Sequence, residues 1–451
     1  MDDTIAAIST PLGEGGIGIV RLSGPEARSI AKRLFQPHHK GQKLRSYRLH
    51  YGHIVDPADG TVVDEVLVSF MRAPHSYTRQ DVVEINCHGG VVPLRRVLQL
   101  TFAAGARPAE PGELTLRAFL NGRIDLAQAE AVLDIVRAKT SAALRVAIDQ
   151  LSGHLSDQVR ALRKRMVDLL AYLEATVDFP EDEIPSREVA PELEELEEEL
   201  TNLLEEAQQG LIYRQGVRAA IVGRPNVGKS SLLNALLRTN RAIVTPIPGT
   251  TRDTLEESCN LQGIPMTLVD TAGIGTAENP IEEQGIERSR QALAQADLVL
   301  LVVDGSEPLQ KQDWDISDSI GTQPTLVVVN KQDLSQRVKL DGFLSRASRV
   351  HISALTGKGL DELEQAVVDL VLSGSVLASQ TPLVSNPRHQ ALLQQAREGV
   401  RAAQDTLTQG LPSDFVAIDL TEAITALGKI TGQTVSEDLL ESIFANFCVG
   451  K

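Results

Sequence analysis

The sequence feature that most constrains this chain is the octapeptide Gly-Arg-Pro-Asn-Val-Gly-Lys-Ser at residues 223–230. It follows an apolar run at 217–222 and precedes a helical pattern that begins at Ser231. A strand, a glycine-bearing loop and a helix in this order predict a phosphate-binding loop, whose backbone N–H groups turn inward around phosphate oxygens. Lys229 is expected to neutralise the β and γ oxygens, and the Ser230 hydroxyl to bind Mg²⁺. A chance glycine-rich turn is the competing interpretation.

The segment around this loop has the pattern of an α/β domain. Apolar runs of strand length alternate with helical stretches, and they fall at 217–222, 266–269, 298–303, 325–329 and 349–352. This alternation predicts right-handed βαβ units and a mainly parallel sheet. Motifs that follow these strands are therefore expected to converge at one edge of the sheet.

Two further motifs complete a phosphate and magnesium site. Asp-Thr-Ala-Gly at 270–273 follows the second apolar run, where its carboxylate can hold Mg²⁺ through water and its glycine N–H can reach a γ-phosphate. Gly-Thr-Thr-Arg-Asp at 249–253 lies between the two motifs, and Thr251 is the expected second Mg²⁺ ligand of a switch loop. Ile274 occupies the position where Ras-like enzymes carry a water-orienting glutamine, so a polar group in 280–288 is expected to replace it.

The choice of base follows from Asn-Lys-Gln-Asp at 330–333. Asp333 can accept hydrogen bonds from the ring N–H and the exocyclic amine of guanine. Adenine offers neither donor there, and a desolvated carboxylate left unpaired costs about 1–3 kcal/mol or more. Ser-Ala-Leu at 353–355 is expected to seat the guanine oxygen on backbone N–H groups. Together these motifs predict a GTP-binding and GTP-hydrolysing domain.

The length and composition of the chain limit its number of domains and its location. A chain of 451 residues is too long for one ordinary core, which favours about three domains. It has no apolar run of about 18 residues to span a bilayer, and its first residues carry acid where a leader would carry base, so we expect a cytoplasmic protein. Its three cysteines, Cys87, Cys259 and Cys448, lack metal-ligand spacing.

The charge is strongly acidic but unevenly placed. The formal net charge is −16, and residues 181–206 hold twelve acidic side chains against the single Arg187. We interpret that run as a solvated helix face. The net charge argues against a surface that is basic throughout, yet it leaves room for a local basic patch that binds RNA.

The flanks differ from the central segment. Residues 1–118 read as mixed α/β, with short apolar segments at 17–22, 62–70 and 82–85. Apolar residues at helical spacing follow over 125–151, 155–177 and 193–203, and they return after residue 378. We therefore expect four segments: an N-terminal domain at 1–118, a helical domain at 119–211 and 378–451, and a nucleotide-binding domain at 212–377 inserted between its halves.

At this point the motifs resemble those of the TrmE-Era-Septin-like GTPases. The flanks narrow the resemblance to the MnmE (TrmE) family of tRNA modification GTPases over essentially the whole chain. The flanking segments that carry it are Gly-Gly-Ile-Gly-Ile-Val-Arg-Leu-Ser-Gly at 15–24, Ser-Tyr-Thr at 76–78, His-Gly-Gly at 88–90, Pro-Gly-Glu at 111–113, Arg-Ala-Phe-Leu-Asn-Gly at 117–122 and Phe-Cys-Val-Gly-Lys at 447–451. Gly-Ile-Glu-Arg-Ser at 285–289 belongs to the GTPase motifs of the wider group.

The resemblance implies a multidomain α/β and all-α fold: an N-terminal α/β tetrahydrofolate-binding domain that also forms a homodimer, a discontinuous helical domain, and an inserted Ras-like P-loop G domain. It further implies GTP and GDP as ligands, tRNA as substrate, and a heterotetramer with the flavoprotein MnmG, which carries the FAD. Together they would install a carboxymethylaminomethyl or aminomethyl group at C5 of the wobble uridine, with a 5-formyl or methylene tetrahydrofolate as one-carbon donor.

The resemblance also assigns site residues. It implies a K⁺ ion at Asn226, Thr245, Ile247 and Thr250, a cation that can stabilise the charge developing during hydrolysis. The implied catalytic residues are Glu282, as the catalytic carboxylate, and Lys229. The alternative interpretation of Glu282 is a solvated glutamate at the start of a helix. The full expected nucleotide set is Gly223, Asn226, Val227, Gly228, Lys229, Ser230, Ser231, Thr245, Pro246, Ile247, Pro248, Gly249, Thr250, Thr251, Asp270, Thr271, Ala272, Gly273, Asn330, Lys331, Asp333, Ser353, Ala354 and Leu355.

For folate, the resemblance implies Arg21, Glu84, Arg123 and Lys451. A carboxylate can accept hydrogen bonds from the N–H groups of the pterin ring, and cations can bind the glutamate carboxylates of folate. Cys448 is a candidate for the modification chemistry or for placement beside the folate. Two rival functions remain open at this stage: a regulatory GTPase of ribosome assembly, and a folate-dependent one-carbon enzyme that acquired a G domain.

Overall fold

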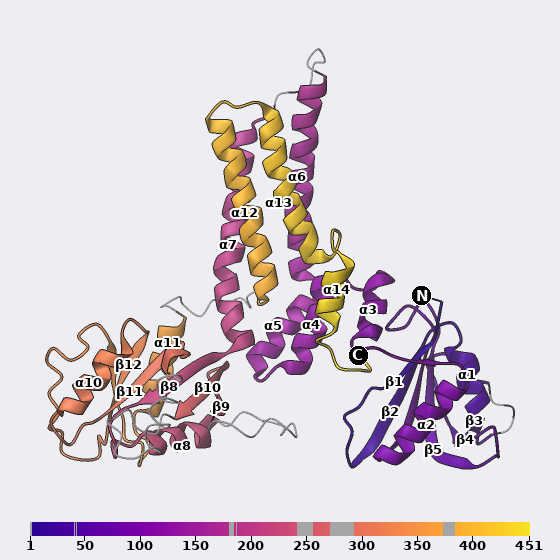
Figure 1. Ribbon diagram of the computed structural model, residues 1–451, viewed down its shortest axis with the longest axis horizontal. Coiled ribbons are helices and arrows are strands. Elements are labelled where there is room, and N and C mark those ends of the chain that lie inside the picture. Colours follow the sequence, from indigo (N-terminus) through magenta and orange to yellow (C-terminus); the bar gives the residue numbers. More distant parts are fainter. Residues whose placement is uncertain are drawn as a thin grey trace. The chain divides into compact units, whose positions relative to one another are not determined.

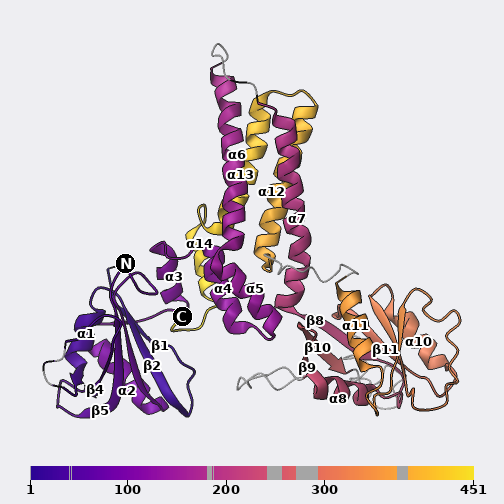
Figure 2. The same ribbon diagram turned by 180° about the vertical axis from the view of Figure 1, so that it is seen from behind.

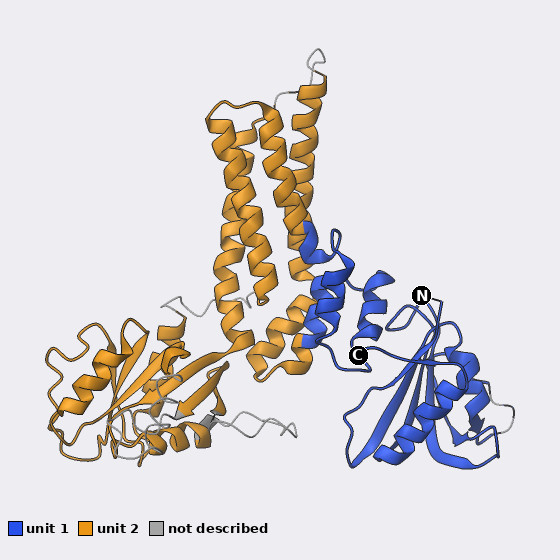
Figure 3. Ribbon diagram, in the orientation of Figure 1, with its two compact units in different colours: residues 1–133, 428–451 blue, residues 134–427 orange. Residues whose placement is uncertain are grey.

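The computed structural model describes residues 2–39, 41, 43–179, 185, 187–240, 256–270, 293–372 and 384–451. It divides into two compact units, one formed by residues 1–133 with 428–451 and the other by residues 134–427 (Figure 3). Within the described residues, no helix is both long enough and apolar enough to cross a membrane.

The first unit is built on a seven-stranded sheet with the order β3-β4-β5-β6-β2-β1-β7 (Figure 1). Neighbouring strands are antiparallel, apart from the parallel pair β1 and β7. The strands are β1 (Ile5–Ile8), β2 (Gly15–Ser23), β3 (Phe35–Pro37), β4 (Leu49–Val55), β5 (Val62–Met71), β6 (Val82–Gly89) and β7 (Arg107–Pro108). The three apolar segments predicted in this region are confirmed as β2, β5 and β6.

Helices α1 (Ala27–Leu34) and α2 (Val91–Ala103) pack on one face of this sheet. Side chains alternate along each strand, so Val66 and Val68 enter this core while Leu67 between them is 41% exposed on the other face. The sheet therefore has one covered and one open face.

Short helices and the chain end complete the first unit. They are α3 (Glu113–Leu120), α4 (Leu126–Arg137), which runs into the second unit, and α14 (Glu437–Phe444). The last residues lie against the segments after β1 and β7: Pro111 pairs with Val449, and the Ser9 hydroxyl donates to the Gly450 carbonyl over 3.0 Å. Gly450 has φ +93°, and a Cβ there would lie 2.3 Å from the Ile8 carbonyl oxygen, so the chain end requires glycine.

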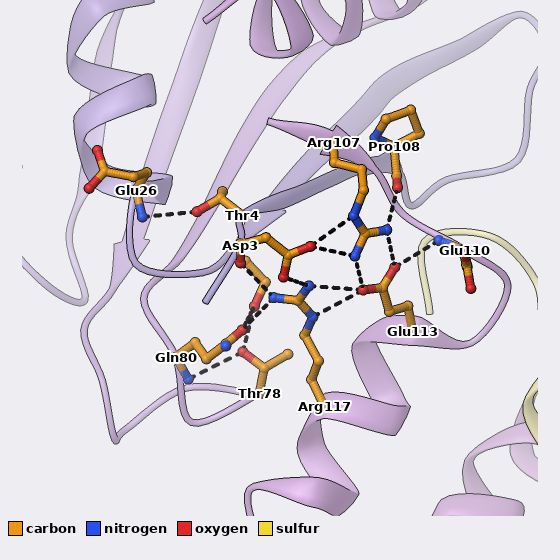
Figure 4. Close-up of polar contacts among 11 residues, drawn as sticks. Asp3, Thr4, Glu26, Thr78, Gln80, Arg107, Pro108, Glu110, Glu113 and Arg117 are labelled. Atoms are coloured by element: carbon orange, nitrogen blue, oxygen red, sulfur yellow. Dashed lines mark hydrogen bonds and ion pairs between the residues drawn. The ribbon is translucent and has the colours of Figure 1, made fainter. Parts of the chain in front are cut away.

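A buried guanidinium ties α3 to the start of the chain (Figure 4). The Arg117 side chain is fully buried, and its Nη2 lies 2.7 Å from Asp3 Oδ1 and 2.8 Å from Glu113 Oε1. Arg107 pairs with the same two carboxylates, so two cations face two anions. Burial alone would raise the pKa of Glu113, but hydrogen bonds from Arg107, Glu110 N–H and Arg117 outweigh it, and the pKa is lowered.

Helices make up a large part of the second unit (Figure 2). They are α5 (Ser141–Ser152), α6 (His154–Asp178), α7 (Val189–Gln215), α12 (Pro387–Thr408) and α13 (Ser413–Thr431), the last of which ends in the first unit. The helical stretch predicted over 125–151 is two helices, α4 and α5, because the Thr140 side chain accepts from Ala143 N–H and starts a new helix. Leu193, Leu196 and Leu200 are buried along α7, which confirms that the part of the acidic run from residue 189 onward belongs to an amphipathic helix.

The rest of the second unit is a six-stranded sheet with the order β13-β12-β11-β8-β10-β9. Its strands are β8 (Val217–Val222), β9 (Glu256–Leu261), β10 (Ile264–Asp270), β11 (Leu298–Asp304), β12 (Thr325–Asn330) and β13 (Ser348–His351). All pairs are parallel except β9 with β10, so the predicted parallel sheet is confirmed, and β9 is an edge strand that the sequence pattern did not reveal. Helices α8 (Lys229–Asn240), α10 (Lys311–Ile320) and α11 (Leu360–Val371) cover it, with apolar cores on both faces.

Candidate functional site

The loop between β8 and α8 has the backbone of a phosphate cradle. Asn226 has φ +64° and Gly228 φ +101°, left-handed conformations that fold the chain back on itself. A Cβ on Gly223 would lie 2.4 Å from the Val302 carbonyl oxygen, so this position requires glycine. Lys229 Nζ donates to the carbonyls of Gly223 and Arg224 over 2.8 and 3.0 Å, which holds the ammonium beside the loop at the N-terminus of α8. This geometry suits a polyphosphate.

Asn330, the last residue of β12, joins this loop to the base-reading segments. Its side chain is 3% exposed; Nδ2 donates to the Val227 carbonyl over 2.8 Å, and Oδ1 accepts from Ala354 N–H over 3.0 Å. A Cβ on Gly228 would lie 2.2 Å from this Nδ2, so that glycine lets the amide approach. One carboxamide thus fixes the phosphate loop against the Ser-Ala-Leu segment.

Asp333 is placed by a neighbouring hydroxyl. Ser353 Oγ donates to Asp333 Oδ1 over 2.6 Å and accepts from Thr356 N–H over 3.2 Å. Asp333 is exposed while Ser353 is fully buried, so the carboxylate is oriented from behind and keeps an open side. Leu355, two residues after Ser353, is 86% exposed. The arrangement suits a carboxylate that reads two adjacent N–H donors of a purine.

Lys331 and Asp304 form an ion pair that the sequence did not point to. Lys331 has φ +66°, and its Nζ lies 2.6 Å from Oδ2 of Asp304, which ends the neighbouring strand β11. Burial tends to raise the pKa of Asp304, but hydrogen bonds from Lys331 and Ser306 outweigh it, and the pKa is lowered. The only sequence signal was an acidic residue at the end of an otherwise apolar strand.

A second unpredicted pair holds the start of the loop. The Arg224 guanidinium is 11% exposed, and its Nη2 lies 2.7 Å from Glu307 Oε2. Its Nε lies 3.5 Å from the buried carboxylate of Asp313 in α10. Nothing local in the sequence distinguishes Arg224 from an exposed arginine, because both partners lie far along the chain.

Several predicted site residues lie outside the described residues. They are Thr245, Pro246, Ile247, Pro248, Gly249, Thr250, Thr251, Thr271, Ala272, Gly273 and Glu282. Asp270 ends β10, where its backbone pairs with Ile221 of β8, one strand end away from the phosphate loop.

In the first unit, three of the four predicted folate residues lie together. Arg21 and Glu84 are cross-strand partners on β2 and β6, and Arg21 Nη2 lies 2.8 Å from Glu84 Oε1. Arg21 Nη1 donates to the Gly450 carbonyl over 3.4 Å, which brings the chain end to this pair. Burial lowers the pKa of Lys451. The positive charge of Arg21 lowers this pKa further, while Cys448 acts in the opposite direction. Both side chains of the ion pair are 23% exposed and remain accessible.

The fourth residue, Arg123, is held elsewhere. Its guanidinium carbon stands 4.7 Å from the ring centroid of Tyr77, and no contact with Arg21, Glu84 or Lys451 is present among the described residues. Cys448 is exposed, whereas Cys87 and Cys259 are buried and burial raises the pKa of each to about 12. Of the three thiols, only Cys448 is accessible for chemistry or ligand contact.

The fold and the site define the chain as a P-loop protein with a Ras-like G domain. Two protein-family models match it: "GTP-binding protein TrmE N-terminus" over residues 4–123 and "MnmE helical domain" over residues 126–448. The chain belongs to the MnmE family of tRNA modification GTPases, and it is a GTP hydrolase that acts in tRNA modification.

Its relatives match from end to end. The tRNA modification GTPase MnmE of Chloroflexus aurantiacus is 54% identical and that of Geobacillus thermodenitrificans 51%, each over 100% of this chain and over 100% and 99% of the relative. Among solved structures, Era from Aquifex aeolicus bound to GDP and AlF4⁻ is 31% identical over 41% of this chain and 66% of that one, with a TM-score of 0.30.

Proposed function

We propose that this chain is a K⁺-activated GTPase whose G domains pair during hydrolysis, and that with MnmG it modifies C5 of the tRNA wobble uridine. The observation that carries the GTPase part of the proposal is the clamp of Asn330, which links the phosphate loop to the segment that holds Asp333. One carboxamide makes triphosphate binding and guanine reading parts of a single site.

We assign the nucleotide roles as follows. The phosphate cradle is formed by Gly223, Asn226, Val227 and Gly228. Lys229 supplies the positive charge that faces the phosphates, and Ser230 and Thr251 supply oxygen ligands for Mg²⁺. Asp333, which is oriented by the hydrogen bond from Ser353, accepts hydrogen bonds from guanine. The backbone N–H of Ala354 donates to the guanine oxygen. Glu282 orients the attacking water in place of the missing glutamine. When bound, Mg²⁺ neutralises charge between the β and γ phosphates.

The left-handed turn at Asn226 supports the K⁺ assignment. At φ +64° the loop is bent at this side chain, whose amide oxygen is a hard ligand of the kind that K⁺ accepts. The other proposed ligands, Thr245, Ile247 and Thr250, would contribute oxygens from the switch loop. A fixed cation there supplies the charge that an arginine supplies in other GTPases.

The Arg21–Glu84 pair beside the chain end supports a tetrahydrofolate site in the first unit. Glu84 can accept from the pterin N–H groups, while Arg21 and Lys451 can hold carboxylates. Arg123, which is stacked on Tyr77, is proposed to contact the folate at the edge of the site. Cys448 is proposed to position the folate or its one-carbon group. Glu84→Gln should weaken 5-formyltetrahydrofolate binding more than tenfold in calorimetry without changing the GTPase rate.

The open face of the first sheet supports the homodimer. Ile17, Tyr51 and Leu67 are 65%, 43% and 41% exposed there, on three different strands and opposite the face that α1 and α2 cover. Apolar side chains grouped on one sheet face are typical of an association surface. Leu67→Glu should therefore yield monomers in light scattering, and a dimer of unchanged affinity would count against this face.

The experiment that tests the proposed function is mass analysis of wobble uridines in cells that lack this protein. Loss of the C5 substituent, restored by the wild-type chain and not by Lys229→Ala, is the expected result. Full modification in the deletion strain would overturn the proposal. Retention on assembling ribosomes together with intact wobble uridines would favour the ribosome-assembly alternative.

A further inference from the structure

A stretch of one-sided positive charge lies in the first unit, far in sequence from the nucleotide motifs. Residues 27–55 contain no Asp or Glu, although the chain carries a formal net charge of −16. The same stretch holds seven Lys and Arg residues and four of the nine histidines. Chance spacing of 60 acidic residues would place several in such a window, so the stretch is locally basic in sequence.

The cations at the centre of this stretch are displayed on a fixed backbone. We call residues 43–48, just before β4, the basic loop. Leu44 is 5% exposed and anchors the loop in the core of the first unit. Four hydrogen bonds hold its backbone and turn: Arg28 Nη2 to Leu44 O (3.1 Å), Arg45 N to His50 Nε2 (3.1 Å), Arg72 N to Ser46 Oγ (3.0 Å) and Tyr47 N to Phe70 O (2.8 Å).

With the backbone held, the charged side chains point outward. Lys43, Arg45 and Arg48 are all exposed, and among the described residues none of them forms an ion pair with a carboxylate. Tyr47 lies between them at φ +56° with its side chain 65% exposed. The buried His50 accepts from the loop and lines the same depression as these three cations. A rigid support lowers the ordering cost when the cations meet a ligand.

The grouping fits a polyanion with flat rings. Three exposed cations match a run of phosphates, and an exposed tyrosine in their midst offers a face on which a base can stack. An acidic lipid surface favours an amphipathic helix with apolar insertion, whereas this loop is short and not helical, with Leu44 buried and Leu49 after it the one exposed aliphatic side chain of the depression.

We propose that the basic loop, through Lys43, Arg45 and Arg48, is a tRNA-binding surface that contacts the phosphate backbone, with Tyr47 beside it. The inference rests on the tRNA substrate of the proposed function. It places part of the RNA on the first unit of this chain instead of leaving RNA recognition wholly to a partner. Phosphate contacts of this kind position the RNA without reading its sequence.

The expected signature is electrostatic. Each phosphate neutralised contributes about 0.7–0.9 to the slope of log affinity against log salt concentration. Loss of two cations should therefore reduce that slope by about 1.5 and weaken binding several-fold between about 50 and 200 mM salt.

The test compares two full-length double variants in fluorescence anisotropy with an unmodified tRNA transcript. One is Arg45→Ala with Arg48→Ala; the matched control, Lys339→Ala with Arg346→Ala, removes two exposed cations between β12 and β13. The GTPase rate of both should equal that of the wild type, which verifies that the G domain is folded, and unchanged urea unfolding of the full chain verifies the first unit. The inference predicts weaker binding and a smaller salt slope for the loop variant alone.

Equal affinity of both variants, or an equal loss in both, would overturn the inference. So would a loop variant that binds tRNA normally but no longer binds phosphatidylserine-containing vesicles, since the surface would then serve a membrane. Wobble-uridine analysis separates the two proposals: modification that depends on this protein, together with unchanged tRNA binding by the loop variant, rejects the basic loop and leaves the proposed function intact.

Discussion

The carboxamide of Asn330 donates to the carbonyl of Val227, 103 positions earlier in the chain, over 2.8 Å. Through its oxygen the same side chain accepts from Ala354 N–H. The base-reading and phosphate-holding segments are thus parts of one hydrogen-bonded unit, although they come from different strand ends of the sheet.

Asn330→Ala should weaken GTP binding about tenfold or more. The substitution leaves the buried Val227 carbonyl without its donor, and an unsatisfied buried group costs about 1–3 kcal/mol. Titration with a fluorescent GTP analogue measures the effect. Asn330→Asp is the informative companion, because it keeps the acceptor for Ala354 but sets a carboxylate against the Val227 carbonyl. If Asn330→Ala bound GTP like the wild type, the clamp would carry no binding energy.

This clamp also shows where prediction from sequence ends. The phosphate loop was predictable because its glycines and lysine are contiguous and follow an apolar strand. The Asn-Lys-Gln-Asp motif at 330–333 was predictable for the same reason. The hydrogen bond from Asn330 to Val227 was not, since it depends on β11 lying between β8 and β12. Strand order is a tertiary property without a local signal.

Arg117 is a second example. The sequence marked Arg117-Ala118-Phe119 only as a family motif, and a lone arginine on a helix is ordinarily exposed. In the structure it is fully buried between Asp3 and Glu113. Asp3 comes from 114 residues earlier, so no periodicity could have revealed the pair. The four-segment division of the chain stays a prediction.

Arg117→Met should destabilise the first unit by about 3–5 kcal/mol at neutral pH, because it leaves the Glu113 carboxylate buried beside fewer cations. Urea unfolding of the full chain measures this. Arg95→Met, which removes an exposed arginine of the same unit, should stay within about 0.5 kcal/mol. Equal effects of both substitutions would contradict a role for burial.

The same cluster sets a pH dependence. Despite burial, which opposes ionisation, hydrogen bonds from Arg107 and Arg117 lower the pKa values of Asp3 and Glu113 in the folded chain. Carboxylates with lowered pKa values contribute stability that is complete above their unfolded values of about 3.9 and 4.3, and lost as the pH falls through the folded values. The gap between wild type and Arg117→Met should therefore shrink below about pH 4. If the difference in unfolding free energy between the two chains grew on acidification, the carboxylates would not have lowered pKa values in the folded chain.

Glu282→Ala should reduce kcat by about 10²–10⁴-fold while GTP affinity barely changes, because a group that orients water acts in the transition state. Single-turnover hydrolysis and equilibrium binding separate the two quantities. Glu283→Ala is the matched control and should hydrolyse GTP normally. A large loss of affinity in Glu282→Ala would mean that the residue is structural.

GTP hydrolysis should be much faster in K⁺ than in Na⁺, since the proposed site holds a K⁺ ion beside the developing negative charge. Asn226→Lys places a fixed ammonium in the loop and should make the rate independent of the salt. Rates in KCl and NaCl at equal ionic strength provide the measurement. Equal rates in the two salts for the wild-type chain would exclude K⁺ activation.

The central claim is that Asp333, held by Ser353 and joined to the phosphate loop through Asn330, selects guanine. The most direct test is the equilibrium affinity of the wild type and of Asp333→Asn for GTP and XTP. Xanthine carries an oxygen where guanine carries its exocyclic amine, so an amide at position 333 should prefer XTP. The account predicts that preference for GTP gives way to preference for XTP; an Asp333→Asn chain that still favoured GTP would contradict it.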